Sequence, residues 1–178
     1  MRKLSTSELG RPTLAALQHL PRIPLHVVLD NVRSAYNVGS IFRTADAFRV
    51  GQVILCGITA QPSNREVQKT ALGSTASVPW QYFPDTVHAV QMLKEQGFRI
   101  VAVEQTDESY SLDVFASDQR PLVLIFGNEV QGIGPALQLA DEALEIPQWG
   151  MKHSLNVAVV AGIVLWEVCK RSGWLLRP

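Results

Sequence analysis

The side chains best suited to hold a phosphate group lie close together in residues 31–44. Asn31, Arg33, Asn37 and Arg43 cluster around a predicted helix start in this segment. Guanidinium groups bind phosphate oxygens through two parallel hydrogen bonds, and a helix N-terminus adds neutral N–H donors. The segment therefore indicates a site for a phosphate-bearing ligand. The alternative is that Asn37 caps the helix and both arginines are solvated.

A second candidate is the glycine-rich stretch 127–134, which follows the apolar run LVLIF. Gly127 and Gly132 suggest tight turns or a close approach of the backbone to a ligand. The stretch is not a P-loop, because Ile133 follows Gly132 where that motif needs lysine. Glu129 stands out, since packing alone does not explain an acid in a glycine turn at a strand end. A purely structural turn remains the alternative.

The third candidate, residues 146–156, leads into a long apolar segment. We expect Lys152 and His153, within this stretch, to be ordinary exposed residues. The sequence shows no Cys, His and Asp spacing typical of a metal site, so no metal is predicted. It also lacks the G-x-S-x-G motif and any Cys/His arrangement of a hydrolase.

The third stretch leads into the apolar segment Ser154–Arg171, which is the most distinctive element of the chain. It has no charge between Ser154 and Trp166, which predicts a helix buried on all sides. Ser154 is the expected N-cap, and Gly173 stands where a helix stop belongs. The uncharged run is shorter than the roughly 20 residues that a membrane span needs.

Short apolar runs alternate with helical patterns along the rest of the chain. This order predicts an α/β domain with a mostly parallel sheet flanked by helices on both faces. Residues 1–24 form a short, polar N-terminal extension with proline breaks, and residues 25–178 form a single domain. We expect strands at 25–29, 52–56, 78–83, 98–103, 122–126 and 143–146, and helices at 14–17, 35–48, 63–72 and 86–96.

Composition adds limits to these predictions. The chain has 178 residues, of which 47% are apolar, as in a globular domain. Cys56 and Cys169 lie in apolar stretches and no signal peptide precedes the domain, so we expect a reduced, cytoplasmic protein. Residues 1–80 hold nine Lys and Arg against four Asp and Glu, and residues 81–178 hold seven against twelve. This asymmetry places positive charge in the first half; random scatter over a mixed surface is the alternative.

Together, the three stretches closely resemble the signature motifs of the SpoU-type RNA 2′-O-ribose methyltransferases, within the SPOUT class. The likeness spans about residues 25–171, and the motifs occur in the expected order on the expected elements. The matching residues are Asn31, Arg33, Asn37, Gly39, Arg43 and Thr44 in the first motif, Gly127, Glu129 and Gly132 in the second, and Ile146, Pro147, Gly150, Ser154, Leu155, Asn156 and Val157 in the third. Gln148 and Ala158 depart from common family residues only slightly.

The resemblance implies a fold and a cofactor. The C-terminal segment would be threaded through a loop as a deep trefoil knot, which general topology rules would not suggest. The cofactor would be S-adenosylmethionine, held by the loops of the knot. The residues implied to bind it are Val103, Glu104, Gln105, Gly127, Asn128, Ile146, Gln148, Ser154 and Leu155.

The resemblance also implies a reaction, methyl transfer to a ribose 2′-hydroxyl of RNA. Arg43, Asn37, Glu129 and Asn156 would be catalytic, while Asn31, Arg33 and Arg43 would bind RNA. The family assigns proton removal to the arginine at position 43, but guanidinium groups hardly ever deprotonate. Arg43 as a phosphate clamp that stabilises the developing alkoxide is therefore the alternative.

The family works as a homodimer, in which the first motif of one subunit lies near the cofactor of the other. Residues 1–24 are too few for the separate RNA-binding domain that many members carry, which slightly favours tRNA over rRNA as substrate. Two other functions stay open. One is a catalytically inactive, knotted RNA-binding protein, and the other is a generic nucleotide-binding enzyme built on the glycine turn.

Overall fold

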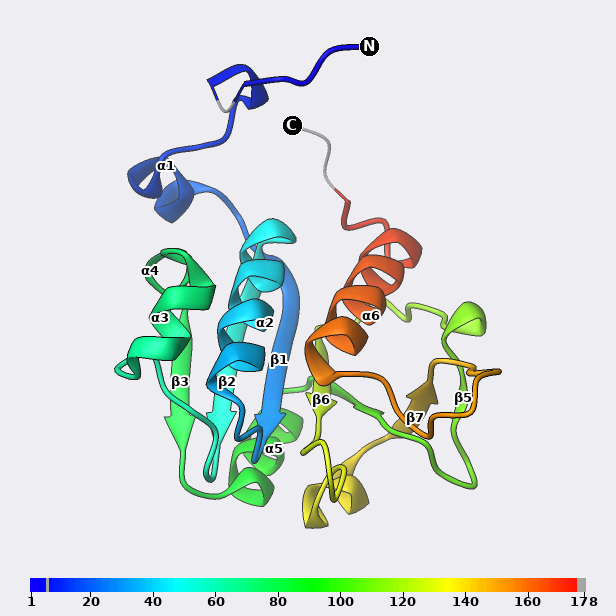
Figure 1. Cartoon of the computed structure of the whole chain (residues 1–178). Coiled ribbons are helices and arrows are strands. Elements are labelled where there is room, and N and C mark those ends of the chain that lie inside the picture. The colour runs from blue at the N-terminus through cyan, green and yellow to red at the C-terminus, as the bar shows by residue number, and fades with distance from the viewer. Residues whose placement is uncertain (6, 176–178) are drawn as a thin grey trace.

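A seven-stranded parallel sheet forms the centre of the computed structural model, which describes residues 1–5 and 7–175. The strands follow the order β3-β2-β1-β6-β4-β7-β5 across the sheet (Figure 1). Since β6 lies between β1 and β4, the chain returns to the middle of the sheet late in its course. The strands are β1 Ile23–Asp30, β2 Val50–Cys56, β3 Trp80–Phe83, β4 Arg99–Val103, β5 Tyr110–Ser111, β6 Leu122–Phe126 and β7 Glu142–Glu145.

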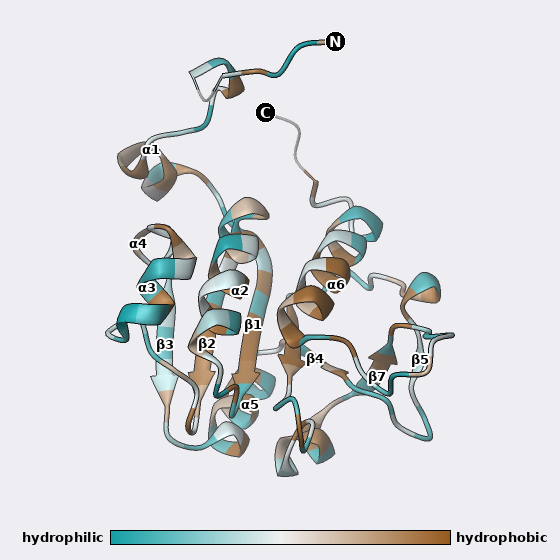
Figure 2. Cartoon of the chain, viewed as in Figure 1, coloured by the Kyte–Doolittle hydropathy of each residue, from teal (hydrophilic) through white to brown (hydrophobic). Residues whose placement is uncertain are grey.

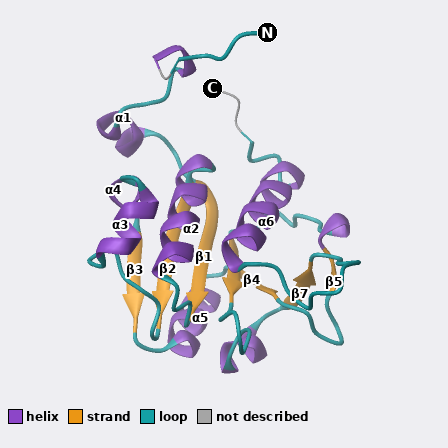
Figure 3. Ribbon diagram, viewed as in Figure 1, coloured by secondary structure: helices purple, strands orange, loops and turns teal. Residues whose placement is uncertain are grey.

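Helices cover the two faces of this sheet unequally (Figure 3). Helices α2, α3, α4 and α6 lie on one face, and α5 with the 3₁₀ helix η3 lies on the other. The helices are α1 Leu14–His19, α2 Ala35–Ala47, α3 Arg65–Ala71, α4 Ser74–Ser77, α5 Thr86–Glu95 and α6 Val157–Arg171; the 3₁₀ helices are η1 Ser7–Leu9, η2 Leu112–Val114 and η3 Pro135–Leu139.

The alternation of side chains along the strands divides the core into two layers. In β1, Leu25, Val27 and Leu29 pack toward α2 and α6. Val28 packs with α5 and η3 on the opposite face. Because both layers are buried, apolar residues occupy both faces of β1, β2, β4 and β6. Figure 2 shows that the central strands are largely hydrophobic.

The predicted α/β class with a largely parallel sheet is confirmed, and each expected strand and helix is present within a few residues of its predicted range. The sequence did not predict β5, α4 or the 3₁₀ helices. Each of these has two to five residues, which is too short to produce a recognisable hydrophobic period.

The prediction for the start of α6 was wrong. The N-cap is Asn156 and not Ser154, because the Asn156 side chain accepts a hydrogen bond from the backbone N–H of Ala158 at 2.9 Å. Ser154 lies in the preceding loop and is exposed. Both residue types are good N-caps, so the local sequence did not distinguish between them.

The prediction that this helix is buried on all sides was also wrong for the single chain. Ala161, Val164 and Leu165 pack into the core. On the other side, Val159, Ile163 and Trp166 are 51%, 40% and 52% exposed. Their spacing of four and three residues places them on one face of the helix, which is an apolar stripe open to solvent.

Two further properties concern the chain as a whole. Within the described residues, no helix combines the length and the apolar character needed to span a membrane. Cys56 and Cys169 are buried, unpaired thiols. Burial is the main cause that raises the pKa of each thiol to about 12, so both stay protonated at neutral pH.

Candidate functional site

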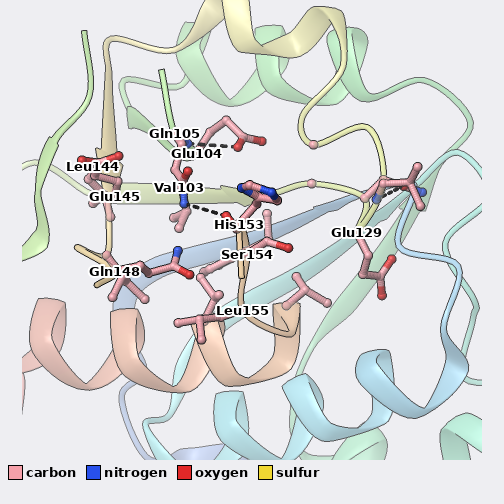
Figure 4. A pocket seen from close by; sticks show the side chains of 18 residues that line it. Val103, Glu104, Gln105, Glu129, Leu144, Glu145, Gln148, His153, Ser154 and Leu155 are labelled. Atoms are coloured by element: carbon pink, nitrogen blue, oxygen red, sulfur yellow. Dashed lines mark hydrogen bonds between the residues drawn. The ribbon is translucent and has the colours of Figure 1, made fainter. Parts of the chain in front are cut away.

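A cavity of about 310 Å³ opens beside the carboxyl ends of β4, β6 and β7 (Figure 4). Parallel α/β sheets build ligand sites at these strand ends. The structure brings together here every residue that the family resemblance implied for cofactor binding. These are Val103, Glu104, Gln105, Gly127, Asn128, Ile146, Gln148, Ser154 and Leu155.

Sequence reasoning missed several residues of the cavity wall. Phe126, Leu144 and Val157 supply apolar surface from β6, β7 and α6. They are also core residues, so their types alone do not mark them as part of a site. His153 is exposed, as predicted, but it lines the cavity too, and its backbone oxygen accepts a hydrogen bond from Gln105 Nε2 at 3.3 Å.

The chemistry of the cavity wall fits S-adenosylmethionine. The volume is within the range of about 300–1,000 Å³ typical of small-molecule sites. Apolar side chains provide a surface for an adenine ring, while the amides of Gln105 and Gln148 provide donors and acceptors. Glu104, Glu129 and Glu145 bring carboxylates to the wall, and these suit the sulfonium and ammonium charges of that cofactor.

Two carboxylates hold the glycine-rich turn that forms one wall. Glu104, just after β4, accepts a hydrogen bond from the backbone N–H of Ile133 at 3.0 Å, and Asp30, at the end of β1, accepts one from Gly134 at 2.8 Å. Thr86 also donates to Asp30, at 2.6 Å, and only 2% of Asp30 is exposed. Since β1 and β4 flank β6, the turn is held from both sides immediately after it leaves the sheet.

Gly132 is required at this turn for a steric reason. Its φ is +67°, and a Cβ atom there would lie 2.3 Å from a carboxylate oxygen of Glu104. Any other residue would be strained and would push the carboxylate away from the turn. The sequence signal for Gly132 as a tight-turn residue was thus correct.

A chain of hydrogen bonds connects the three motif stretches. Asn156 Nδ2 donates to Asn37 Oδ1 at 3.1 Å, and Asn37 Nδ2 donates to Glu129 Oε1 at 2.6 Å. Asn37 lies in the first turn of α2, Glu129 in the glycine-rich turn, and Asn156 caps α6. Ser34, not Asn37, is the N-cap of α2, so the side chain of Asn37 is free to join this chain.

Asn31 is engaged within the protein. It adopts a left-handed conformation with φ of 57°, and its side chain accepts from the N–H of Ile58 at 3.1 Å and donates to Asp30 at 2.8 Å. Its carbonyl accepts from Asn128 Nδ2 at 2.9 Å. Asn31 therefore joins the first motif to the glycine-rich turn, and its contact with RNA stays a prediction.

Arg33 and Arg43 are placed differently from the other motif residues. Both side chains are exposed, and neither lines the cavity. Among the residues that the structure describes, neither has a carboxylate partner. The structure therefore leaves both guanidinium groups available to an external anion, outside the cofactor cavity of their own chain.

Metal binding has no support in the geometry. Over residues 1–5 and 7–175, no three His, Cys, Asp or Glu side chains come together in a way that could hold an ion.

Comparison with known proteins identifies the family to which this chain is similar. The model of the SpoU rRNA methylase family matches residues 24–166. The chain is 35% identical over 161 residues to a tRNA (guanosine(18)-2′-O)-methyltransferase of Aquifex aeolicus, with 86% of this chain and 74% of the relative covered. It is 32% identical over 151 residues to a 23S rRNA (guanosine-2′-O-)-methyltransferase of Vibrio parahaemolyticus, with 83% and 60% covered.

Solved structures agree with this match. The S-adenosylmethionine-bound rRNA methyltransferase of Sinorhizobium meliloti superimposes with a TM-score of 0.80 at 31% identity, covering 90% of this chain and 61% of that one. The chain thus spans about 60% of the length of these two rRNA enzymes. Because the family model matches residues 24–166, which is most of the chain, and hydrogen bonds join the three motif stretches, the chain belongs to the SpoU rRNA methylase family.

Proposed function

We propose that this chain is an S-adenosylmethionine-dependent methyltransferase that methylates a ribose 2′-hydroxyl of structured RNA. The observation that carries the proposal is the cavity, where all residues implied to bind the cofactor converge. The relatives named as RNA 2′-O-methyltransferases and the cofactor-bound Sinorhizobium structure support the same activity and cofactor.

The roles of individual residues follow from their contacts. S-adenosylmethionine would supply an electrophilic methyl group on a sulfonium, so the protein needs to position the reactants and manage charge. The hydrogen bonds Asn156–Asn37–Glu129 hold the first turn of α2 and the glycine-rich turn close to the N-terminus of α6. Glu104 and Asp30 keep the wall of the cavity in shape.

Arg43 is the residue that we assign to the developing charge on the 2′-oxygen. Its guanidinium is exposed and has no carboxylate partner among the described residues, which suits a clamp on an RNA phosphate beside the reacting hydroxyl. Because guanidinium groups stay protonated, the proton leaves to water while Arg43 stabilises the alkoxide.

The substitution Arg43→Ala tests this assignment. We expect methyl transfer from tritiated S-adenosylmethionine to fall by about 10²–10³-fold, because one charge-stabilising donor is lost. The cofactor affinity, measured by calorimetry, should stay near the wild-type value, since Arg43 does not line the cavity. Equal loss of transfer and of cofactor affinity would refute the role, and the exposed Arg65→Ala serves as a matched control.

A homodimer explains why Arg43 lies outside the cavity of its own chain. We propose that the exposed stripe of Val159, Ile163 and Trp166 on α6 packs against a second copy, and that this brings the Arg43 of one subunit to the cavity of the other. The apolar character of the stripe supports the proposal, because burying it removes hydrophobic surface from water.

We also propose that the C-terminal segment is knotted. Family membership supports a trefoil knot, in which the loop 146–155 and α6 pass through a preceding loop. In single-molecule pulling from both termini, a knotted chain would stay shorter than the roughly 3.3–3.6 Å per residue of a free extended chain. Full extension would contradict the knot.

The RNA substrate is proposed to be tRNA, with rRNA as the second candidate. The Aquifex relative named as a tRNA enzyme has higher identity and greater coverage than the Vibrio relative named as an rRNA enzyme. A reducing compartment such as the cytoplasm suits the two buried, unpaired thiols. Mapping of 2′-O-methyl sites in total RNA from cells with and without this gene would identify the target. An inactive RNA-binding protein, the competing function, predicts no difference between these cells and no cofactor binding.

A further inference from the structure

An exposed aromatic side chain lies between two parts of the cavity wall. Gln148 and His153 line the cavity, but the four residues between them do not. Trp149, in this intervening tip, is 93% exposed. The tryptophan ring has a large apolar surface, and its exposure to water is unfavourable. An exposed ring of this kind therefore indicates a contact with a partner.

Two further apolar side chains on the loops around the cavity are also exposed. Met151, two residues further along the tip, is 86% exposed. Val130, on the glycine-rich turn, is 90% exposed and also lines the cavity. Exposed apolar side chains therefore occur on two separate loops that contribute to the cavity wall. Lys152, beside Met151, is exposed and has no carboxylate partner among the described residues.

We propose that Trp149 stacks on the base of the nucleotide to be methylated, or on its immediate neighbour, while Lys152 contacts an adjacent phosphate. The inference rests on the proposed function. A ribose whose 2′-hydroxyl reaches the cavity carries its base on the neighbouring carbon, so the base has to lie at the mouth. Proteins hold splayed-out RNA bases in this way, by stacking them on aromatic side chains and neutralising the phosphates with cations.

RNA, rather than another protein surface, fits this tip best. The tip combines an aromatic ring with an unpaired cation within four residues, which is complementary to a base and a phosphate. The α6 stripe, by contrast, has three apolar residues and no cation among them, which suits a protein partner. A second copy of the chain covering Trp149 is the competing outcome of the test below.

Three substitutions at position 149 separate these possibilities. Trp149→Ala removes the ring, Trp149→Leu keeps apolar bulk without a π face, and Trp149→Phe keeps a π face. The probe is total RNA from cells lacking the gene, with tritiated S-adenosylmethionine as methyl donor. We expect the KM for RNA to rise by about 5- to 100-fold in both the Ala and Leu variants, the equivalent of one lost stacking contact. Trp149→Phe keeps most of the affinity.

Lys152 has its own test. Lys152→Gln should reduce the slope of log affinity against log salt by about 0.7–0.9, the value for one phosphate contact. Lys152→Arg keeps the slope.

Trp80→Leu is the control for the substitutions at Trp149, because it removes a tryptophan from the edge strand β3, at the far end of the sheet from β7.

Three results would overturn the inference. The first is an unchanged KM for RNA in Trp149→Ala. The second is full activity in Trp149→Leu, which would indicate a general apolar contact. The third is a monomeric Trp149→Ala variant when the wild type is dimeric, which would show that a second copy covers the ring. If the wild-type protein itself transfers no methyl group, the proposed function fails, and this outcome is distinct from all three.

Discussion

Several of the residues around the candidate site form hydrogen bonds that hold the glycine-rich turn in position. Asp30 and Glu104 each accept a backbone N–H from the same glycine-rich turn, and the Asn156–Asn37–Glu129 chain links that turn to two helices. Arg43 is the exception, since its guanidinium is exposed and is not tied to a carboxylate in the described part of the chain.

The substitution Asp30→Asn should separate cavity shape from chemistry. The buried carboxylate accepts from Gly134 and Thr86, and an amide replaces one of these acceptors with a donor. Losing a hydrogen bond to a charged, buried acceptor costs about 1.5–3 kcal/mol in the free energy of unfolding. We expect a loss of this size in urea denaturation, together with weaker cofactor binding by calorimetry.

The control for this change is Asp107→Asn, at an exposed position, where both properties should stay near wild type. If Asp30→Asn binds the cofactor with unchanged affinity despite the lost stability, then Asp30 supports the fold and does not shape the cavity.

At this scale the family resemblance pointed to residues that the fold brings into contact, but it did not predict how they contact one another. Spacing and residue type selected Asn37 and Glu129 as candidates, and the family resemblance added Asn156. The hydrogen bonds between them span 92 and 119 residues of sequence, so they depend on the tertiary fold. The role of Asp30 appears only in the fold, because Gly134, which donates to it, is 104 residues away in the sequence.

At the scale of elements, helix α6 has two different faces. One face packs into the core, and the other presents Val159, Ile163 and Trp166 to solvent. A uniformly apolar sequence does not reveal this division, since every residue is compatible with burial. The same uniformity, together with two good capping residues near its start, made the first turn of the helix ambiguous.

The exposed face of α6 predicts an effect on assembly. Ile163→Asp places a charge in the centre of the stripe, where burial against a second copy would be strongly unfavourable. We expect a monomer by light scattering at concentrations where the wild type is a dimer. Methyl transfer should fall with the dimer, because Arg43 would no longer reach a partner's cavity.

Leu72→Asp, which puts the same charge on an exposed leucine at the end of α3, should leave the wild-type assembly unchanged. A wild-type protein that is monomeric while fully active would contradict the shared site.

At the scale of the whole molecule, the sheet order explains the position of the cavity. Strand β6 lies between β1 and β4, so the turn after it meets residues from both neighbours, and β7 adds its own loop beyond β4. The sequence predicted the parallel α/β class from alternating patterns. It did not predict this order by itself, because strand neighbours depend on contacts between segments far apart in the chain.

The uneven distribution of charge along the chain fits the proposed dimer. Positive residues are in excess in the first 80 residues, which include Arg33 and Arg43, and negative residues are in excess in the remainder, which supplies the cavity. A dimer that joins the first motif of one copy to the cavity of the other would bring these halves together. This arrangement would place cations for RNA beside a wall of carboxylates for the cofactor.

The chemical position of the transferred methyl group tests the central claim most directly. Total RNA from cells lacking the gene would be incubated with the protein and tritiated S-adenosylmethionine, and then hydrolysed in alkali. Alkaline cleavage needs a free 2′-hydroxyl, so 2′-O-methylation leaves the label in alkali-stable dinucleotides. We predict label in that fraction, and about 10²–10³-fold slower labelling with Arg43→Ala. Label in mononucleotides, or no incorporation by the wild type, would contradict the account.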